Sequence, residues 1–150
     1  MCNVTPIGVV HSPYKTRSDA PPQDGDKVSK IVVFEEYVPA LKDIEGFSHI
    51  IVIYYLHLSR GWRLQTTTPW DVELHGLFTT RSPNRPSPLG LGVVELLERG
   101  RDFLVVRGLD AIEGTPVLDI KPYVPRLDSR PGAKTGWLED RIRISEEDDR

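Results

Sequence analysis

The sequence is poor in several features that define large classes of protein. It holds one cysteine, Cys2, among 150 residues, which excludes an intramolecular disulfide and any multi-cysteine metal site. Its longest apolar run, residues 50–56, is far shorter than the ~20 residues that a membrane-spanning helix needs. The first residues lack the basic region and the apolar stretch of a secretory signal. We therefore expect a cytoplasmic protein with no membrane partner.

The chain also lacks a strong excess of charge of one sign. Its formal net charge is -3. Residues 138–150 hold six acids and three arginines, so residues 1–137 are balanced, with 16 basic and 16 acidic side chains. A protein that coats DNA is basic overall, so we expect no DNA partner. Any RNA would have to be held by local arginines and not by a global field.

Several catalytic motifs are missing as well. The sequence contains no P-loop, no complete GxGxxG loop and no GxSxG elbow. Two histidines, His49 and His57, begin and follow the same apolar run. On an extended strand they would lie about 26 Å apart, which is too far for one metal ion. We therefore predict no metal centre.

What the chain does have is frequent punctuation and short apolar segments. Its 13 prolines and 12 glycines leave no room for long helices. Residues 49–56 (HIIVIYYL) are apolar on both faces, which predicts a buried central strand. Further strands are predicted at residues 7–11, 31–34, 72–78, 93–98, 103–107, 117–120 and 141–145, with one short helix within residues 38–44. Such a set is typical of an all-β barrel or sandwich.

Long irregular segments separate these strands, and residues 78–92 (FTTRSPNRPSPLGLG) are the most unusual of them. Three prolines stiffen the segment, and it presents Arg81 and Arg85. A stiff loop with fixed donors suits the recognition of an anionic or polar ligand. The alternative is a structural turn with solvated arginines.

A second segment of interest is residues 114–125 (GTPVLDIKPYVP). On a strand, Asp119, Lys121 and Tyr123 would face one way, while Leu118 and Ile120 face the other. An acid, an amine and a phenol on one face can form a polar cluster in a binding site. The alternative is an exposed ion pair of Asp119 with Lys121, which contributes little to stability.

Together these segments resemble the TsaA-like family, whose members include tRNA (N6-threonylcarbamoyladenosine) methyltransferases. The resemblance covers almost the whole chain in order. It rests on residues 7–15 (IGVVHSPYK), the pair Pro22-Gln23, and residues 46–57 (GFSHIIVIYYLH), 77–96 (LFTTRSPNRPSPLGLGVVEL) and 109–125 (LDAIEGTPVLDIKPYVP). It implies a small closed β-barrel, in agreement with the seven or eight short strands, the long functional loops and the one short helix that the segments themselves predict. The barrel domain would span residues 1–137, followed by a closing strand and an acidic tail in residues 138–150.

The resemblance also implies an activity and a set of site residues. Members bind S-adenosylmethionine (SAM) without a Rossmann fold and methylate N6 of threonylcarbamoyladenosine at position 37, in the anticodon loop of tRNA. A homodimer is expected from the same likeness. Carried over by motif, the contacts with SAM would come from Gln23, Asp24, Gly25, His57, Leu58, Arg81, Leu91, Leu109 and Asp110.

For catalysis we assign Asp119, Lys121 and Tyr123. The N6 atom of a carbamoylated adenine has a delocalised lone pair, so its proton must be removed or oriented during attack. Asp119 would be the proton acceptor, with Lys121 and Tyr123 holding it in place. Two other functions remain open: a non-catalytic SAM-binding module, and an RNA-binding barrel of the OB type that is indifferent to SAM.

Overall fold

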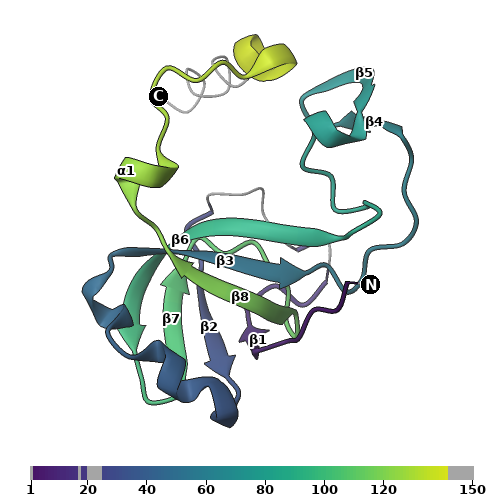
Figure 1. The fold of residues 1–150 in the computed structure, drawn as a ribbon. Coiled ribbons are helices and arrows are strands. Elements are labelled where there is room, and N and C mark those ends of the chain that lie inside the picture. The colour runs from purple at the N-terminus through teal and green to yellow at the C-terminus, as the bar shows by residue number, and fades with distance from the viewer. Residues whose placement is uncertain (1, 17, 20–24, 142–150) are drawn as a thin grey trace. The chain divides into compact units, whose positions relative to one another are not determined.

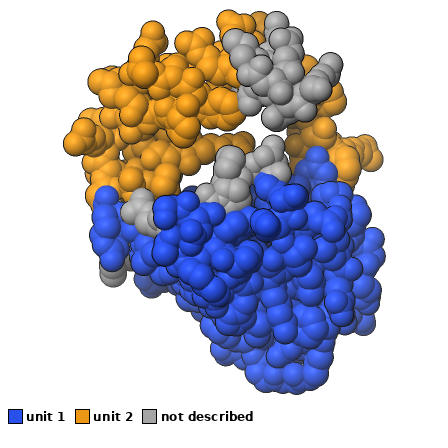
Figure 2. All heavy atoms as spheres, turned by 180° about the vertical axis from the view of Figure 1, so that it is seen from behind, with its two compact units in different colours: residues 1–60, 87–123 blue, residues 61–86, 124–150 orange. Residues whose placement is uncertain are grey.

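The computed structural model describes residues 2–16, 18–19 and 25–141, and it divides the chain into two compact units. The first unit comprises Met1–Arg60 and Ser87–Tyr123, and the second comprises Gly61–Pro86 and Val124–Arg150. Figure 2 colours the two units separately. Among the described residues, no helix has the length and apolar character that crossing a membrane requires.

The first unit is a closed barrel in which every strand pairs with antiparallel neighbours (Figure 1). Its order is β1-β2-β7-β6-β3-β8. The predicted all-β class and the barrel are thus confirmed. The predicted number of seven or eight barrel strands is wrong, since six described strands close the barrel. The strands are β1 (Gly8–His11), β2 (Val28–Val33), β3 (His49–Tyr55), β6 (Leu89–Arg99), β7 (Phe103–Arg107) and β8 (Pro116–Pro122).

The barrel closes because each strand turns one row of apolar side chains inward. Successive side chains of a strand point to opposite faces, so alternate residues fill the interior. The fully buried side chains are Val10, Ile31, Ile50, Val52, Val94, Leu104, Val106, Leu109 and Val117. Strand β3 lies between β6 and β8, as its apolar sequence predicts, although its outward residues Ile51 and Ile53 are only half-buried.

Within the described residues, only short helical turns accompany the barrel. The connection from β2 to β3 forms η1 (Glu35–Leu41) and η2 (Ile44–Gly46), both 3-10 helices. The predicted short helix at residues 38–44 is therefore displaced toward the N-terminus and divided in two. Pro39 lies inside η1 and lacks the N–H that a longer α-helix would need.

The second unit is built on a two-stranded hairpin. It comprises β4 (Gln65–Thr68), β5 (Asp71–Gly76), η3 (Leu77–Thr79), α1 (Pro125–Asp128) and η4 (Gly136–Leu138). The sequence predicts β5 but misses β4, whose Gln-Thr-Thr-Thr has no apolar alternation. The predicted closing strand at residues 141–145 lies, except for Arg141, outside the described residues.

Candidate functional site

The strand directions of the barrel bring several connections to one of its ends. Neighbouring strands are antiparallel, so β1, β3 and β7 end where β2, β6 and β8 begin. The connections at this end are residues 12–27 and residues 108–115, and the chain also leaves the barrel after Tyr55 and re-enters it at Leu89. We call this the Tyr54 end, after the last inward side chain of β3.

A buried tyrosine and an aspartate meet at the Tyr54 end. Tyr54 is 2% exposed, and its hydroxyl donates a hydrogen bond to Oδ1 of Asp110, which lies in the connection 108–115. Burial raises the pKa of Tyr54 well above its ordinary value, and the charge and hydrogen bond of Asp110 raise it further. The phenol therefore stays protonated and acts as a donor.

The charge of the Asp110 carboxylate also affects a second tyrosine, Tyr14. Tyr14 follows β1 and is buried. Burial raises its pKa, and the negative charges of Asp26 and Asp110 add to that effect. Asp26 and Asp110 come from the connections 12–27 and 108–115, so both connections contribute charge near the Tyr14 hydroxyl.

A polar network ties these two connections together. The Glu113 carboxylate lies 2.7 Å from Nδ1 of His11 and 3.4 Å from Nζ of Lys15, and it accepts the Ser12 amide at 2.8 Å. The hydrogen bonds from His11 and Ser12 and the charge of Lys15 lower the pKa of Glu113 to about 2. The Gly108 amide also donates to the Lys27 carbonyl oxygen at 3.1 Å.

Of the predicted SAM contacts, five described residues lie at the Tyr54 end. Gly25 approaches Gly108 so closely that a Cβ on Gly108 would lie 3.2 Å from the Gly25 carbonyl oxygen. Leu109 is in the core, and Asp110 accepts Tyr54. His57 and Leu58 directly follow β3, and the Leu58 side chain is exposed.

The other four predicted SAM contacts stay predictions. Gln23 and Asp24 lie outside the described residues. Arg81 belongs to the second unit. Leu91 is at the beginning of β6 but on its outer face, half exposed and opposite Ile53 of β3.

The predicted catalytic residues form two small groups on β8 and just after it. Lys121 Nζ lies 3.0 Å from Oδ2 of Asp119, and both side chains are substantially exposed. Asp119 pairs with Ile53 and Lys121 with Ile51, so the strand runs away from the Tyr54 end. Tyr123 stands edge-on to His49, at the beginning of β3. Within one chain, the structure does not bring these three side chains to Asp110.

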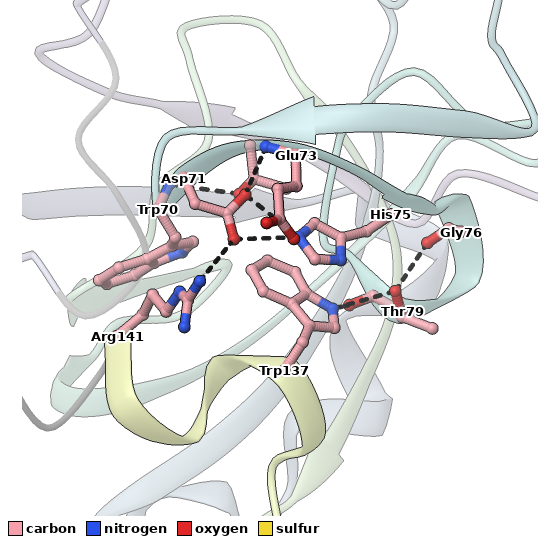
Figure 3. Close-up of polar contacts among 9 residues, drawn as sticks. Trp70, Asp71, Glu73, His75, Gly76, Thr79, Trp137 and Arg141 are labelled. Carbon is pink, nitrogen blue, oxygen red and sulfur yellow. Dashed lines mark hydrogen bonds and ion pairs between the residues drawn. The ribbon is translucent and has the colours of Figure 1, made fainter.

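A further cluster, in the second unit, is not found by the sequence reasoning (Figure 3). Asp71, Glu73 and His75 offer ligand atoms within 4.8 Å of one another. Nε2 of His75 lies 3.0 Å from Oδ2 of Asp71, and Arg141 approaches the same oxygen at 3.4 Å. The alternation of these three residues along one strand is the signal that could have indicated them.

Residues of the same cluster contact the segment that follows α1 and hold it against the hairpin. The Trp137 ring stacks on His75 at 3.7 Å, and its Nε1 donates to the carbonyl oxygen of Thr79 at 3.2 Å. Partial burial pushes the pKa of Asp71 up. Hydrogen bonds from His75 and from the Glu73 amide, with the charges of His75 and Arg141, outweigh this and hold it below its ordinary value. His75 and Arg141 thus both contact the Asp71 carboxylate, and we interpret the cluster as a structural clasp.

Comparison with known proteins agrees with this architecture. An S-adenosyl-L-methionine-binding protein of Archaeoglobus fulgidus is 51% identical over 125 residues, covering 82% of this chain and 90% of that protein. The tRNA (adenine(37)-N6)-methyltransferase of Escherichia coli is 34% identical over 146 residues, covering 89% of this chain and 62% of that protein. The crystal structure of TrmO from Pseudomonas aeruginosa superposes with a TM-score of 0.78 at 29% identity, over 93% of this chain.

The last two comparisons concern longer proteins. The chain spans 62% of the Escherichia coli methyltransferase and 63% of the Pseudomonas aeruginosa TrmO chain. The family described as tRNA-methyltransferase O N-terminal domain matches residues 9–129, which include all six barrel strands except the first residue of β1. The chain therefore belongs to the family of the tRNA-methyltransferase O N-terminal domain.

Proposed function

We propose that this protein is a SAM-dependent methyltransferase that modifies N6 of threonylcarbamoyladenosine at position 37 of tRNA. The observation that carries the proposal is the convergence at the Tyr54 end of five residues assigned to SAM by resemblance. They come from three separate parts of the chain, before β2, after β3 and after β7. The relatives named for SAM binding and for tRNA methylation support both halves of the proposal.

The chemistry of the Tyr54 end fits SAM. The Asp110 carboxylate accepts hydroxyl or N–H donors, which the ribose and the amino groups of SAM present. Leu58, in the chain segment that leaves β3, offers an exposed apolar side chain. The buried Ser29 Oγ, one residue inside β2 from this end, has no hydrogen-bond partner among the described residues. SAM bound there would supply a methyl group on a sulfonium, and the transfer of that methyl group needs no metal ion.

Local arginines of the second unit, and not its overall charge, would hold an RNA substrate. The unit is balanced over its whole length, with nine lysine and arginine side chains against nine carboxylates. Three arginines, Arg63, Arg81 and Arg85, lie in residues 61–86 alone. Phosphate contacts of such residues make RNA affinity fall with rising salt concentration. Action on tRNA would also agree with the expected cytoplasmic location.

Asp119 remains our proposed proton acceptor, held by Lys121 and with Tyr123 farther along the segment. Asp119 lies on the outer face of the barrel. On the neighbouring strands β3 and β6, this face carries an apolar row of Ile51, Ile53, Leu91 and Val93. We propose that a second copy of the chain packs on this row. Such a homodimer would bury the apolar side chains and bring the Asp119–Lys121 pair to the interface.

The test is methyl transfer to RNA. The protein is incubated with SAM carrying a labelled methyl group and with total tRNA from its own host, and the RNA is then digested to nucleosides. We expect label in a methylated threonylcarbamoyladenosine. SAM binding without labelled nucleoside would favour the non-catalytic SAM-binding module, and tRNA binding unaffected by SAM would favour the OB-type barrel. Either result would overturn the proposal.

A further inference from the structure

The inward end of β3 carries a side chain that is unusual for a barrel core. Tyr54 is buried together with Ile50 and Val52 of the same strand, yet it brings a polar hydroxyl into that row. A buried phenol needs a hydrogen-bond partner, because an unmade hydrogen bond in the interior is costly. Here the hydroxyl donates to Oδ1 of Asp110.

The neighbouring strand is shaped around the same ring. Gly90 of β6 is the cross-strand partner of Tyr54. A Cβ on Gly90 would lie 2.3 Å from the ring atom Cε2 and 2.4 Å from Cζ, closer than atoms can approach. Glycine is therefore required at this position for the ring to reach Asp110.

In its hydrogen bond with Asp110, the Tyr54 hydroxyl is always the donor. The pKa of Tyr54 is raised, so the group is a donor throughout the working pH range. A bond to one carboxylate oxygen fixes how the carboxylate is turned, and a carboxylate can still accept further donors. A donor held on a buried ring loses little conformational freedom when a ligand binds, which is the condition for a preorganised site.

We propose that Tyr54 is a positioning residue, whose hydroxyl orients the Asp110 carboxylate to accept a donor group of SAM, and that Gly90 provides the space for its ring. This inference rests on the proposed function, because it takes SAM as the ligand of the Tyr54 end. It adds two residues, Tyr54 and Gly90, to which the family resemblance assigned no contact.

The central experiment compares two neighbouring tyrosines. Tyr54→Phe keeps the ring against Gly90 and removes only the hydroxyl. Tyr55→Phe is the matched control, because Tyr55 is on the opposite face of β3 and 40% exposed. SAM affinity is measured by calorimetry. We expect Tyr54→Phe to weaken SAM binding about tenfold, as one lost charge-assisted hydrogen bond would, and Tyr55→Phe to leave it within about twofold.

A double-mutant cycle tests whether Tyr54 acts through Asp110. If it does, Tyr54→Phe combined with Asp110→Asn should bind SAM no more weakly than Asp110→Asn alone, because the two substitutions remove one interaction chain. Additive losses would mean that the hydroxyl contacts SAM itself or acts through another group. Either additive losses or an unchanged affinity in Asp110→Asn would overturn the inference.

Kinetics separate positioning from a general structural role. Tyr54→Phe should raise the KM for SAM and leave kcat at saturating SAM within about twofold, whereas a loosened barrel would lower both kcat and thermal stability. Gly90→Ala should weaken SAM binding in the same way, with a lower melting temperature because the ring must shift.

The outcomes distinguish the role of Tyr54 from the proposed function. If the unsubstituted protein does not bind SAM, the proposed function falls, and this inference falls with it. If the unsubstituted protein binds SAM and Tyr54→Phe binds it equally well, only the inference falls.

Discussion

At the scale of single residues, burial decides what identical side chains do. Tyr54 and Tyr55 are adjacent, but strand alternation turns one inward to Asp110 and leaves the other exposed. Asp110 and Asp119 differ in the same way: the first accepts a buried phenol, and the second forms an exposed ion pair with Lys121. Preorganised chemistry therefore concentrates at the Tyr54 end.

Glu113 gives a prediction about acid stability. Its pKa is lowered from 4.5 to about 2 in the folded state, so its contribution is fully present above pH 4.5 and is lost as the pH falls toward 2. Glu113→Gln should reduce the free energy of unfolding by about 1 kcal/mol at pH 7, a value discounted for partial exposure, and by less near pH 2. Urea unfolding at several pH values measures this, and an equal loss at all pH values would contradict it.

Asp119 gives a prediction about catalysis. Asp119→Asn keeps the size of the side chain but removes the proton acceptor, so kcat for methyl transfer to tRNA should fall by about 100-fold or more. SAM affinity should change by less than about twofold, and stability by less than about 0.5 kcal/mol, because the pair with Lys121 is exposed. Asp140→Asn, at another exposed site, is the control. Unchanged turnover in Asp119→Asn would remove Asp119 from the mechanism.

At the scale of elements, one face of β5 contacts the clasp and the other is exposed to solvent. Asp71 and His75 face the clasp, while Val72 and Leu74 of the same strand are exposed. A two-stranded hairpin is marginally stable by itself, so contacts such as those of Trp137 contribute strongly to its order. The clasp thus explains how β4 and β5 persist without a third strand in the described residues.

Removing the clasp should loosen the hairpin selectively. Trp137→Ala removes the stacking on His75 and two hydrogen bonds to Thr79, at a cost of about 1–2 kcal/mol to the local structure. Hydrogen exchange of the β4 and β5 amides should accelerate at least several-fold, while the barrel amides keep their rates. Trp62→Ala is the control, because Trp62 is half exposed and precedes β4. Equal acceleration in both variants would argue against a specific clasp.

The elements also show where sequence patterns are informative. Continuous apolar character identifies β3, and β-branched and aromatic residues identify β7 over residues 103–107, the same bounds as in the structure. The same reasoning misses β4 because threonine-rich segments carry no hydrophobic alternation, and it begins β6 four residues late. The early part of β6 is Leu-Gly-Leu-Gly, and its glycines suggest a loop until the Tyr54 ring explains Gly90.

At the scale of the whole molecule, the outer face of the barrel yields a prediction about assembly. Val93 is half exposed in the apolar row, opposite Ile51. A glutamate there would place an unpaired charge in the proposed interface, which is strongly unfavourable. By light scattering, the unsubstituted protein should have twice the chain mass of 17.0 kDa, and Val93→Glu should have the mass of one chain. Val72→Glu, on the exposed hairpin face, should remain dimeric; a monomeric unsubstituted protein would refute the dimer.

The sequence by itself determined the all-β class, the barrel strands of continuous apolar character, and, through long motifs, the family. These properties are local, since periodicity, β-branched residues and motif order are written along the chain. Tertiary structure decided the number of strands that close the barrel, the pairing of Gly90 with Tyr54, and the meeting of Tyr54 with Asp110, 56 residues apart. It also decided that Asp119 and Lys121 lie on the outer face. Such contacts depend on strand register and closure, which no short segment specifies.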